Sequence, residues 1–221
     1  MQAVLILVRE IRSMLERSAR RNPAVQEVLN GLSAVDLTSE AVLPWQPDLP
    51  DHRETLDLAI SAIPLSLRAI ASAVSDANEQ LQWRVDRGIY YAKDADVGAP
   101  YLNGNMHCEL IGPGGSAFRT EDFTLGLFLL APRVLYRDHI HIAPELYLTL
   151  TEPSGWRFGD SPWRDFPAGS IIWNQPNEPH ATRVYSVPFL SVYSWTRDVH
   201  SKCKVVPMPD WRQVEQGLPA S

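Results

Sequence analysis

The sequence predicts a mainly β protein, in which a barrel of short strands follows an α-helical region. Two observations support this fold class. Apolar residues recur at helical spacing through residues 1–83, whereas after residue 90 short β-rich runs alternate with Gly, Pro, Asp and Asn. Many short strands with frequent turns are typical of a sandwich or a closed barrel. We therefore expect a helical region over 1–85 that packs on a barrel over 86–221.

The helical region begins with a segment whose apolar residues share one helical face: Val4, Val8, Ile11 and Leu15. Asn22-Pro23 breaks this helix and starts a shorter one, which is expected to end at Gly31. A third segment runs from Glu54 to Trp83, and Pro64 is expected to break or kink it. Its apolar stripe consists of Leu56, Ile60, Ile63, Leu67, Ile70 and Val74. Such a stripe is typical of a helix that covers a sheet or a dimer partner, so a homodimer is a possible assembly.

The barrel region is expected to contain strands wherever β-rich runs stand between turn residues. The runs are Met106–Ile111, Phe123–Ala131, Glu145–Thr151, Ser170–Trp173, Ala181–Val187 and Phe189–Thr196. No internal repeat or low-complexity tract interrupts them, and the tail after Val205 is expected to pack along the outside. These features predict one barrel rather than a repeat array.

Composition excludes several classes of protein. The 221 residues are 45% hydrophobic and 21% charged, with a net charge of −6, which argues against a broad phosphate-binding surface, so we expect no nucleic-acid partner. Cys108 and Cys203 are too few for a disulfide framework and lack metal-pair spacing, which favours buried, unreactive thiols.

The first residues contain an apolar run, Ala3 to Val8, that Arg9 and Glu10 interrupt. This run is far shorter than the roughly 20 residues of a membrane span. It also lacks the basic segment and cleavage site of a secretory signal. We expect a soluble, cytoplasmic protein without a membrane partner.

Three histidines and one glutamate form the most informative pattern in the chain. His139 and His141 alternate on a predicted strand, so both side chains share a face. Glu145 follows Pro144, which can bend the chain toward the same centre, and His180 comes later in the sequence. Three imidazoles and one carboxylate complete the first coordination shell of one divalent transition metal, for which zinc, iron(II) and manganese are all compatible.

The order of these four residues resembles the cupin superfamily. Its first motif contains His-x-His with a glutamate a few residues on, matched here by His139, His141 and Glu145. Its second motif contains Pro-x-Gly followed by a histidine, matched by Pro167-Ala168-Gly169 and His180. The resemblance implies a double-stranded β-helix, or jelly-roll, barrel that holds the metal.

Aromatic residues around the quartet narrow the resemblance. Tyr136 precedes His141, Tyr147 follows Glu145, and Trp195 comes after the second motif. With the quartet, they resemble the bacterial cupin-type dimethylsulfoniopropionate (DMSP) lyases, and the resemblance is concentrated in residues 133–197. It implies a carbon–sulfur lyase that forms dimethyl sulfide and acrylate by β-elimination from a small sulfonium carboxylate.

The chemistry of that elimination can be tested on these residues. Proton removal next to a carboxylate builds negative charge, which a cation coordinating the carboxylate stabilises as a Lewis acid. A nearby cation also favours the phenolate of a tyrosine, whose ordinary pKa is about 10. Tyr147 shares a strand face with Glu145 and is the candidate base. Tyr136 could orient substrate, bind the metal when substrate is absent, or assist Tyr147.

The sulfonium group of such a substrate carries a positive charge and leaves as a neutral thioether, so it needs an attractive wall and no general acid. Aromatic faces supply attraction of about 0.5–2 kcal/mol each. Trp173, Tyr193 and Trp195 lie in or near the late predicted strands and are the candidates for this wall. Ordinary core packing is the alternative role for each of them.

Two other functions fit parts of the pattern. An iron-dependent dioxygenase or an isomerase acting on a different small carboxylate would keep the metal and change the reaction. A non-enzymatic cupin sensor or storage-type protein would use the helical region for association. Arg17, Arg20 and Arg21 form a basic cluster too small for a DNA-reading helix and typical of a solvated helix face.

Overall fold

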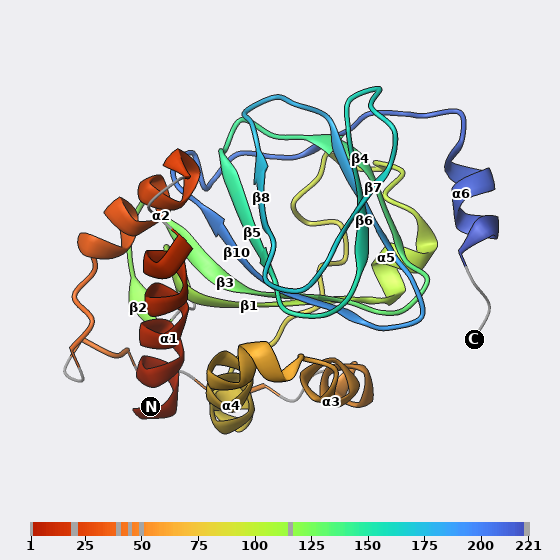
Figure 1. The fold of residues 1–221 in the computed structure, drawn as a ribbon. Helices are drawn as coiled ribbons and strands as arrows, with labels where there is room; N and C mark the ends of the chain where they lie inside the picture. Colours follow the sequence, from red (N-terminus) through yellow and green to blue (C-terminus); the bar gives the residue numbers. More distant parts are fainter. Residues whose placement is uncertain are drawn as a thin grey trace.

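A computed structural model of the chain describes residues 2–18, 22–38, 41–43, 46–48, 51–114 and 117–218. Figure 1 shows two facing β-sheets, with helices gathered beside one of them and a C-terminal helix beyond the other. The helices are α1 (Gln2–Ser18), α2 (Pro23–Ser33), α3 (Arg53–Ser61), α4 (Arg68–Ala77), α5 (Ala99–Asn103) and α6 (Trp211–Gly217), with short 3-10 turns η2 (Leu65–Leu67) and η3 (Asn78–Gln80). The prediction of a mainly β fold with an N-terminal helical region is confirmed, whereas the division at residues 85/86 stays a prediction.

The strands form two sheets in the manner of a jelly roll. One sheet has the order β2-β1-β3-β10-β5-β8 and the other β11-β4-β9-β6-β7. In chain order they are β1 (Asn105–Gly112), β2 (Phe118–Arg119), β3 (Thr124–Leu130), β4 (Leu135–Ile140), β5 (Glu145–Thr149), β6 (Ser154–Phe158), β7 (Arg164–Phe166), β8 (Ile171–Asn174), β9 (His180–Val184), β10 (Phe189–Trp195) and β11 (Lys204–Val205). Strands β2, β6, β7 and β11 were not predicted, and β4 contains the predicted strand position of His139, although it ends before His141.

The six-stranded sheet is covered on both faces, which places the cavity of the protein on its inner side. Its outer face packs against the helices in one hydrophobic core that joins Val8, Val28 and Val74 to Leu127 and Leu148. Its inner face contributes Phe128, Tyr147 and Phe189 to a second, aromatic core between the sheets. Full burial of β3 follows from this double cover.

Helix α2 begins where the sequence predicts but does not end at Gly31. The Asn22 side chain accepts a hydrogen bond from the Ala24 amide at 3.1 Å, which caps the first turn. The helix continues to Ser33. Gly31 instead leaves room for a neighbouring ring, because a Cβ atom there would lie 2.5 Å from Cδ2 of Phe123. The glycine serves packing rather than termination.

Pro64 breaks the third helical segment, as expected, and α3 and α4 lie on either side of it. Most of the predicted stripe, including Leu56, Ile63, Ile70 and Val74, is buried in the core of its own chain. The stripe therefore covers the sheet, and the homodimer stays a prediction.

Among the described residues, no single helix is long and apolar enough to cross a membrane. The segments Arg53–Ser61 and Leu65–Gln80, which are bent by 95° relative to each other, reach the necessary length and composition only when taken together.

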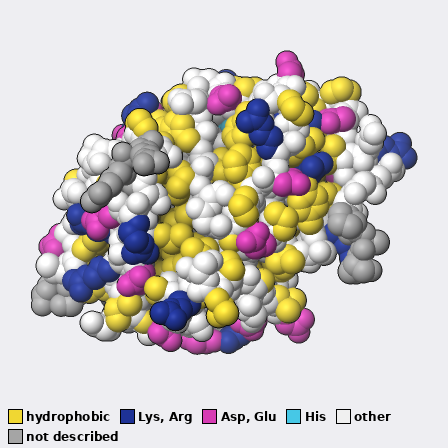
Figure 2. All heavy atoms as spheres, viewed as in Figure 1, with side chains coloured by type: hydrophobic (Ala, Val, Ile, Leu, Met, Phe, Trp, Pro, Cys, Tyr) yellow, Lys and Arg dark blue, Asp and Glu magenta, His cyan; other side chains and the backbone are white. Residues whose placement is uncertain are grey.

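The described surface has no single basic patch on the side drawn in Figure 2, where Lys and Arg stand among acidic and apolar side chains. Arg17 pairs with Ser13 within α1, as a solvated helix residue does. Arg20 and Arg21 lie outside the described residues. Cys108 and Cys203 are free and buried, in agreement with the role expected for them.

Candidate metal centre

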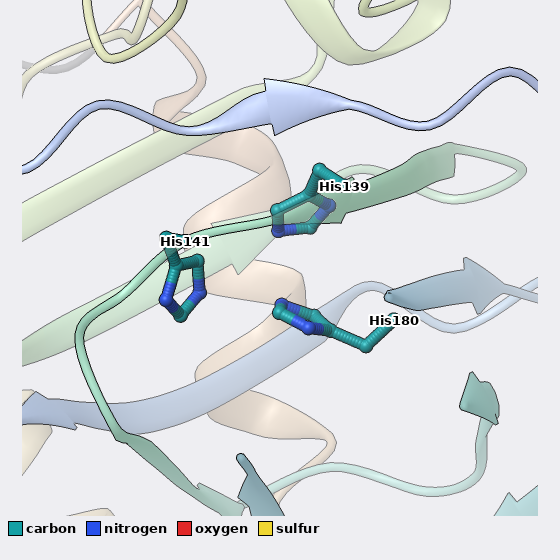
Figure 3. A group of neighbouring side chains, drawn as sticks. All are labelled: His139, His141 and His180. Atoms are coloured by element: carbon teal, nitrogen blue, oxygen red, sulfur yellow. The ribbon is translucent and has the colours of Figure 1, made fainter. Parts of the chain in front are cut away.

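The three histidines converge from two neighbouring strands (Figure 3). His139 lies on β4 and is paired directly with His180 on β9, while His141 follows one residue after β4 ends. Their ring centroids are 4.3 Å apart for His139 and His180, and 4.9 Å apart for His141 and His180. One ring nitrogen from each histidine lies within 4.8 Å of the others, and all three residues are buried. This group could hold a metal ion.

Main-chain carbonyl groups fix the orientation of all three rings. Nδ1 of His139 is 2.7 Å from the carbonyl oxygen of Arg137, Nδ1 of His141 is 2.7 Å from that of Ala143, and Nδ1 of His180 is 2.9 Å from that of Glu178. A carbonyl oxygen only accepts hydrogen bonds, so each Nδ1 carries the proton in a neutral ring. Each Nε2 then keeps its lone pair.

Glu145 joins the histidines at the start of β5. Its Oε2 lies 3.3 Å from Nε2 of His141 and 3.6 Å from Nε2 of His180. The same oxygen accepts a hydrogen bond from the Asn174 amide, and Oε1 accepts one from the Trp195 indole, both at 2.7 Å. The carboxylate is therefore held from two sides while it faces the rings.

Electrostatics prepare this group to bind a cation. Burial lowers the pKa of His139 to about 3 and that of His180 well below its usual value, so both rings are neutral at pH 7. Burial alone would lower the pKa of His141, but Glu145 outweighs it and the net shift is upward. For Glu145 burial would raise the pKa, yet the charge and the hydrogen bond of His141 outweigh it and the pKa is lowered to about 2. The carboxylate is ionised.

Two orphaned nitrogen atoms show that the residues fit a metal. Among the described residues, Nε2 of His141 and Nε2 of His180 are buried and have no hydrogen-bond partner. A buried lone pair without a donor is costly unless another partner is present. Imidazole nitrogens and a carboxylate oxygen suit zinc, iron(II) or manganese. His139, His141, Glu145 and His180 therefore form a plausible ligand set.

Tyr136 covers the metal centre from the side of β4. Its ring stacks on His139 with centroids 4.2 Å apart, and on Tyr101 at 4.4 Å. Its hydroxyl accepts a hydrogen bond from Tyr91 at 2.6 Å. Burial, followed by the neighbouring phenols, raises the pKa of Tyr136 well above its usual value. The sequence did not indicate Tyr91 or Tyr101 as partners.

Tyr147 lies beside Glu145 on the inner face of β5, and 5% of its surface is exposed. Its ring packs among Phe128, Trp156 and Phe189, which fixes its direction. Burial first, and then the charge of Glu145, raise the pKa of Tyr147 well above its usual value. In the chain alone this phenol holds its proton.

The three residues expected to form the aromatic wall separate into two groups. Trp195 and Tyr193 line the cavity. Trp195 also lies over His141, with ring centroids 4.6 Å apart. Trp173 faces the other way, because it is paired with Leu146 and packs into the core beneath the helices. The expectation for Trp173 is wrong: side chains alternate along β8, and its neighbour Asn174 is the one that faces Glu145.

A cavity of about 90 Å³ opens beside the metal centre. Its polar and aromatic lining includes Tyr136, Glu145, Tyr147, Tyr193 and Trp195. Three carboxylates, from Asp86, Glu109 and Glu145, belong to the lining, and among the described residues no Lys or Arg does. The cavity therefore favours cationic over anionic groups.

Several residues of the site escaped the sequence analysis. Asn174 stands at the end of a β-rich run, and only the pairing of β5 with β8 reveals that it meets Glu145. Asp86 and Tyr101 precede the barrel strands, and their hydrogen bond at 2.8 Å joins a loop to α5. His107 also lines the cavity, and its Nε2 lies 2.9 Å from the Tyr90 hydroxyl.

Comparison with protein families gives one match that covers most of the chain. Residues 46–191 match the family described as dimethylsulfoniopropionate lyase. A curated relative, the DMSP lyase DddQ of Ruegeria pomeroyi, is 26% identical over 133 residues. That alignment covers 60% of this chain and 63% of the relative, so the chain spans less than two thirds of the curated relative's length.

Solved structures support the same fold. The crystal structure of DMSP lyase DddQ from Ruegeria pomeroyi superposes with a TM-score of 0.69 at 21% identity, and covers 93% of this chain and 96% of its own. A second structure, from a study of the DMSP lyases RdDddP and RnDddQII, gives a TM-score of 0.69 at 18% identity over 93% and 98% of the two chains. At these identities the likeness establishes the fold, helical region included.

Proposed function

We propose, from the premise that this chain belongs to the dimethylsulfoniopropionate lyase family, that it is a metal-dependent carbon–sulfur lyase. Its substrate is dimethylsulfoniopropionate, and its products are dimethyl sulfide and acrylate. The observation that carries the proposal is that a three-histidine, one-glutamate group adjoins a cavity through Glu145. The buried phenol of Tyr147 lines the same cavity, and no Lys or Arg of the described residues does.

His139, His141, Glu145 and His180 would hold the metal, since their ligand atoms already face one another and their other polar atoms are paired. A divalent cation bound there supplies positive charge, which stabilises a substrate carboxylate during proton loss and favours a phenolate nearby. Zinc, iron(II) and manganese are the candidates.

Tyr147 is the proposed base. Its oxygen takes the proton from the carbon next to the substrate carboxylate. The electron pair of that C–H bond forms the carbon–carbon double bond, and the bond from the next carbon to sulfur breaks with its electrons moving to sulfur. The sulfonium leaves as neutral dimethyl sulfide, acrylate remains, and the proton stays on Tyr147 until solvent takes it. Tyr136 is proposed to orient substrate through its fixed hydroxyl.

The lining of the cavity supports an onium substrate over a plain carboxylate. Trp195 and Tyr193 present aromatic faces, which attract a cation without reacting with it. A guanidinium or ammonium group in the lining would repel a sulfonium, and the described lining contains neither. Trp173 is no longer a candidate for this wall, because it faces the helices.

The decisive experiment is headspace detection of dimethyl sulfide from purified protein supplied separately with Zn, Mn and Fe(II). We expect product with at least one metal and none after chelation, since the pKa of Tyr147 is raised in the chain alone. Acrylate should form in equal amount. Absence of both products with every metal would contradict the proposed reaction.

A further inference from the structure

A row of residues crosses the inner face of the six-stranded sheet and ends at a carboxylate far from the metal centre. Glu109 on β1 is paired with Gly126 on β3, Gly126 with Tyr193 on β10, and Tyr193 with Tyr147 on β5. Residues directly opposite each other share a face, so Glu109 and Tyr147 face the same cavity. Their backbones are three strand spacings, or about 14 Å, apart.

Gly126 leaves space for an aromatic ring between these two ends. A Cβ atom at this position would lie 2.6 Å from Cε1 and 2.9 Å from Cζ of Tyr193. The Tyr193 ring therefore lies over the glycine, on the side of Tyr147 where Glu109 stands. The carboxylate of Glu109 and the face of Tyr193 line one end of the cavity, and Glu145 lines the other.

The charge of Glu109 is compensated only in part: burial raises its pKa by more than the Gly114 backbone and Arg84 lower it. Its Oε1 is buried and has no hydrogen-bond partner among the described residues. Burial raises its pKa to about 7, so the carboxylate is mostly ionised at pH 8. The neighbouring His107 is neutral, because burial lowers its pKa to about 4. By contrast, the Asp86 carboxylate accepts hydrogen bonds from Tyr101 and from two backbone amides.

A carboxylate whose burial outweighs its partners destabilises a fold, and such groups persist where a ligand uses them. We propose that Glu109 and Tyr193 form an onium-binding end of the cavity, which selects substrates whose tail is cationic over substrates of the same shape whose tail is neutral. This inference rests on the lyase function proposed above and assigns recognition of the sulfonium charge to Glu109. The metal centre then takes the carboxylate end, so the substrate enters in one orientation.

The test compares two ligands that differ in charge and not in shape, neither of which carries the sulfonium leaving group. One is the trimethylammonium analogue of the substrate, and the other is its tert-butyl isostere, in which carbon replaces nitrogen. Calorimetry on the zinc-loaded protein at pH 8 measures both affinities. We expect the wild type to prefer the ammonium ligand about tenfold or more, because a charge at this range acts through a low effective dielectric.

Glu109→Gln should reduce that preference to about twofold or less, while leaving the affinity for the tert-butyl ligand unchanged. Glutamine keeps an oxygen that can accept from the Gly114 backbone, so the turn after β1 is retained. Glu109→Asp keeps the charge and should retain part of the preference. Glu121→Gln is the matched control, since it removes an exposed carboxylate and should change neither affinity.

The inference would be wrong if the wild type did not prefer the ammonium ligand over the tert-butyl ligand. It would also be wrong if the Glu109→Gln variant kept the preference of the wild type. A variant that lowers turnover but keeps the preference would also overturn the inference, since Glu109 would then act on the reaction and not on the charge. The dimethyl sulfide assay separates this failure from failure of the lyase proposal. If the wild type forms dimethyl sulfide but does not prefer the ammonium ligand, only the onium-binding role is wrong. If it prefers the ammonium ligand but forms no dimethyl sulfide, only the proposed reaction is wrong.

Discussion

The two ends of the cavity differ in how their charged groups are supported. At the metal end the Nδ1 atoms of His139, His141 and His180 face carbonyl oxygens, and Glu145 accepts from Asn174 and Trp195. At the other end Glu109 has an oxygen without a partner in the described structure. The metal end is built for fixed geometry, which a coordination shell requires. Among the described residues, the other end supplies a carboxylate with one free oxygen, which suits an onium group that forms no hydrogen bonds.

Loss of one ligand is expected to have the largest effect. His180→Ala should weaken metal binding by more than about 100-fold, since loss of an outer-shell partner alone costs about 10–100-fold. Activity should fall to background. Metal content after dialysis and chelator competition measure the change, with His200→Ala as an exposed control. Unchanged metal stoichiometry would show that the histidine group is not the metal site.

Tyr147→Phe tests the residue that lies between the two ends of the cavity. It removes the phenol oxygen and keeps the ring that packs against Trp156. If Tyr147 is the base, kcat should fall by about 10²–10⁴-fold while metal content stays unchanged. Tyr185→Phe, on the outer face of the other sheet, removes a hydroxyl that pairs with Asp165 and should leave kcat as it is. Retained activity in Tyr147→Phe would assign the base elsewhere.

Asn174→Ala tests whether the metal end depends on its supports. The amide donates to Oε2 of Glu145 at 2.7 Å, so its loss should let the carboxylate move. We expect metal affinity to fall by about 10-fold, with fold and thermal stability measured in parallel. Gln175→Ala changes the exposed neighbour and serves as control. Equal metal affinities in both variants would mean that Trp195 alone holds Glu145.

The charge of Glu109 should favour ligand binding but lower the stability of the fold. Its effect on stability is the smallest of the predicted effects. Its folded pKa of about 7 lies above the value of an unfolded glutamate, so the stability that it contributes is full below about pH 4.3 and is lost as the pH rises through 7. The charged or titratable groups that interact with it are Arg84, Tyr90, Cys108 and Tyr193.

Glu109→Gln should therefore melt at a higher temperature than the wild type at pH 8, by about 2–4 °C for each kcal/mol of charge burial removed. The two proteins should have similar Tm values at pH 4.5. Thermal melts of both proteins over this pH range measure the difference in Tm. Subtracting one Tm from the other cancels the contribution of the other titrating groups, which both proteins share. A variant that is less stable at pH 8 would show that the carboxylate has a structural partner.

The sequence predicted those parts of the fold in which one face is apolar. The helices before residue 83 and six of the strand runs follow from periodicity. Strand β6 was not predicted, and β4 was predicted only at His139 and His141; both strands carry a charged residue on their outer face, Arg157 and Asp138. In the structure these two form a buried ion pair at 2.6 Å, and Trp211 of α6 donates to Asp138. The pairing of distant strands, not local propensity, makes these segments β.

The site was predictable where residue types at fixed spacing carry the chemistry. His139, His141, Glu145 and His180 lie together in the structure, and Tyr136 stacks on His139, whereas the roles of these residues and of Tyr147 stay predictions. Trp173 and Asn174 show the limit of that reasoning, since a shift of one position along β8 decides which side chain faces Glu145. Glu109 had no local signal at all, because its role depends on register across four strands.

The main-chain carbonyls behind the three histidines affect how the protein tolerates mutation. Oxygen atoms of residues 137, 143 and 178 set the ring tautomers, and every amino acid at these positions offers the same oxygen. Side chains there can change during evolution, or in a library, without altering which nitrogen of each histidine faces the other two. A chain can therefore diverge widely around this group and keep the same three nitrogen atoms facing one another, provided that the backbone path of β4 and β9 stays the same.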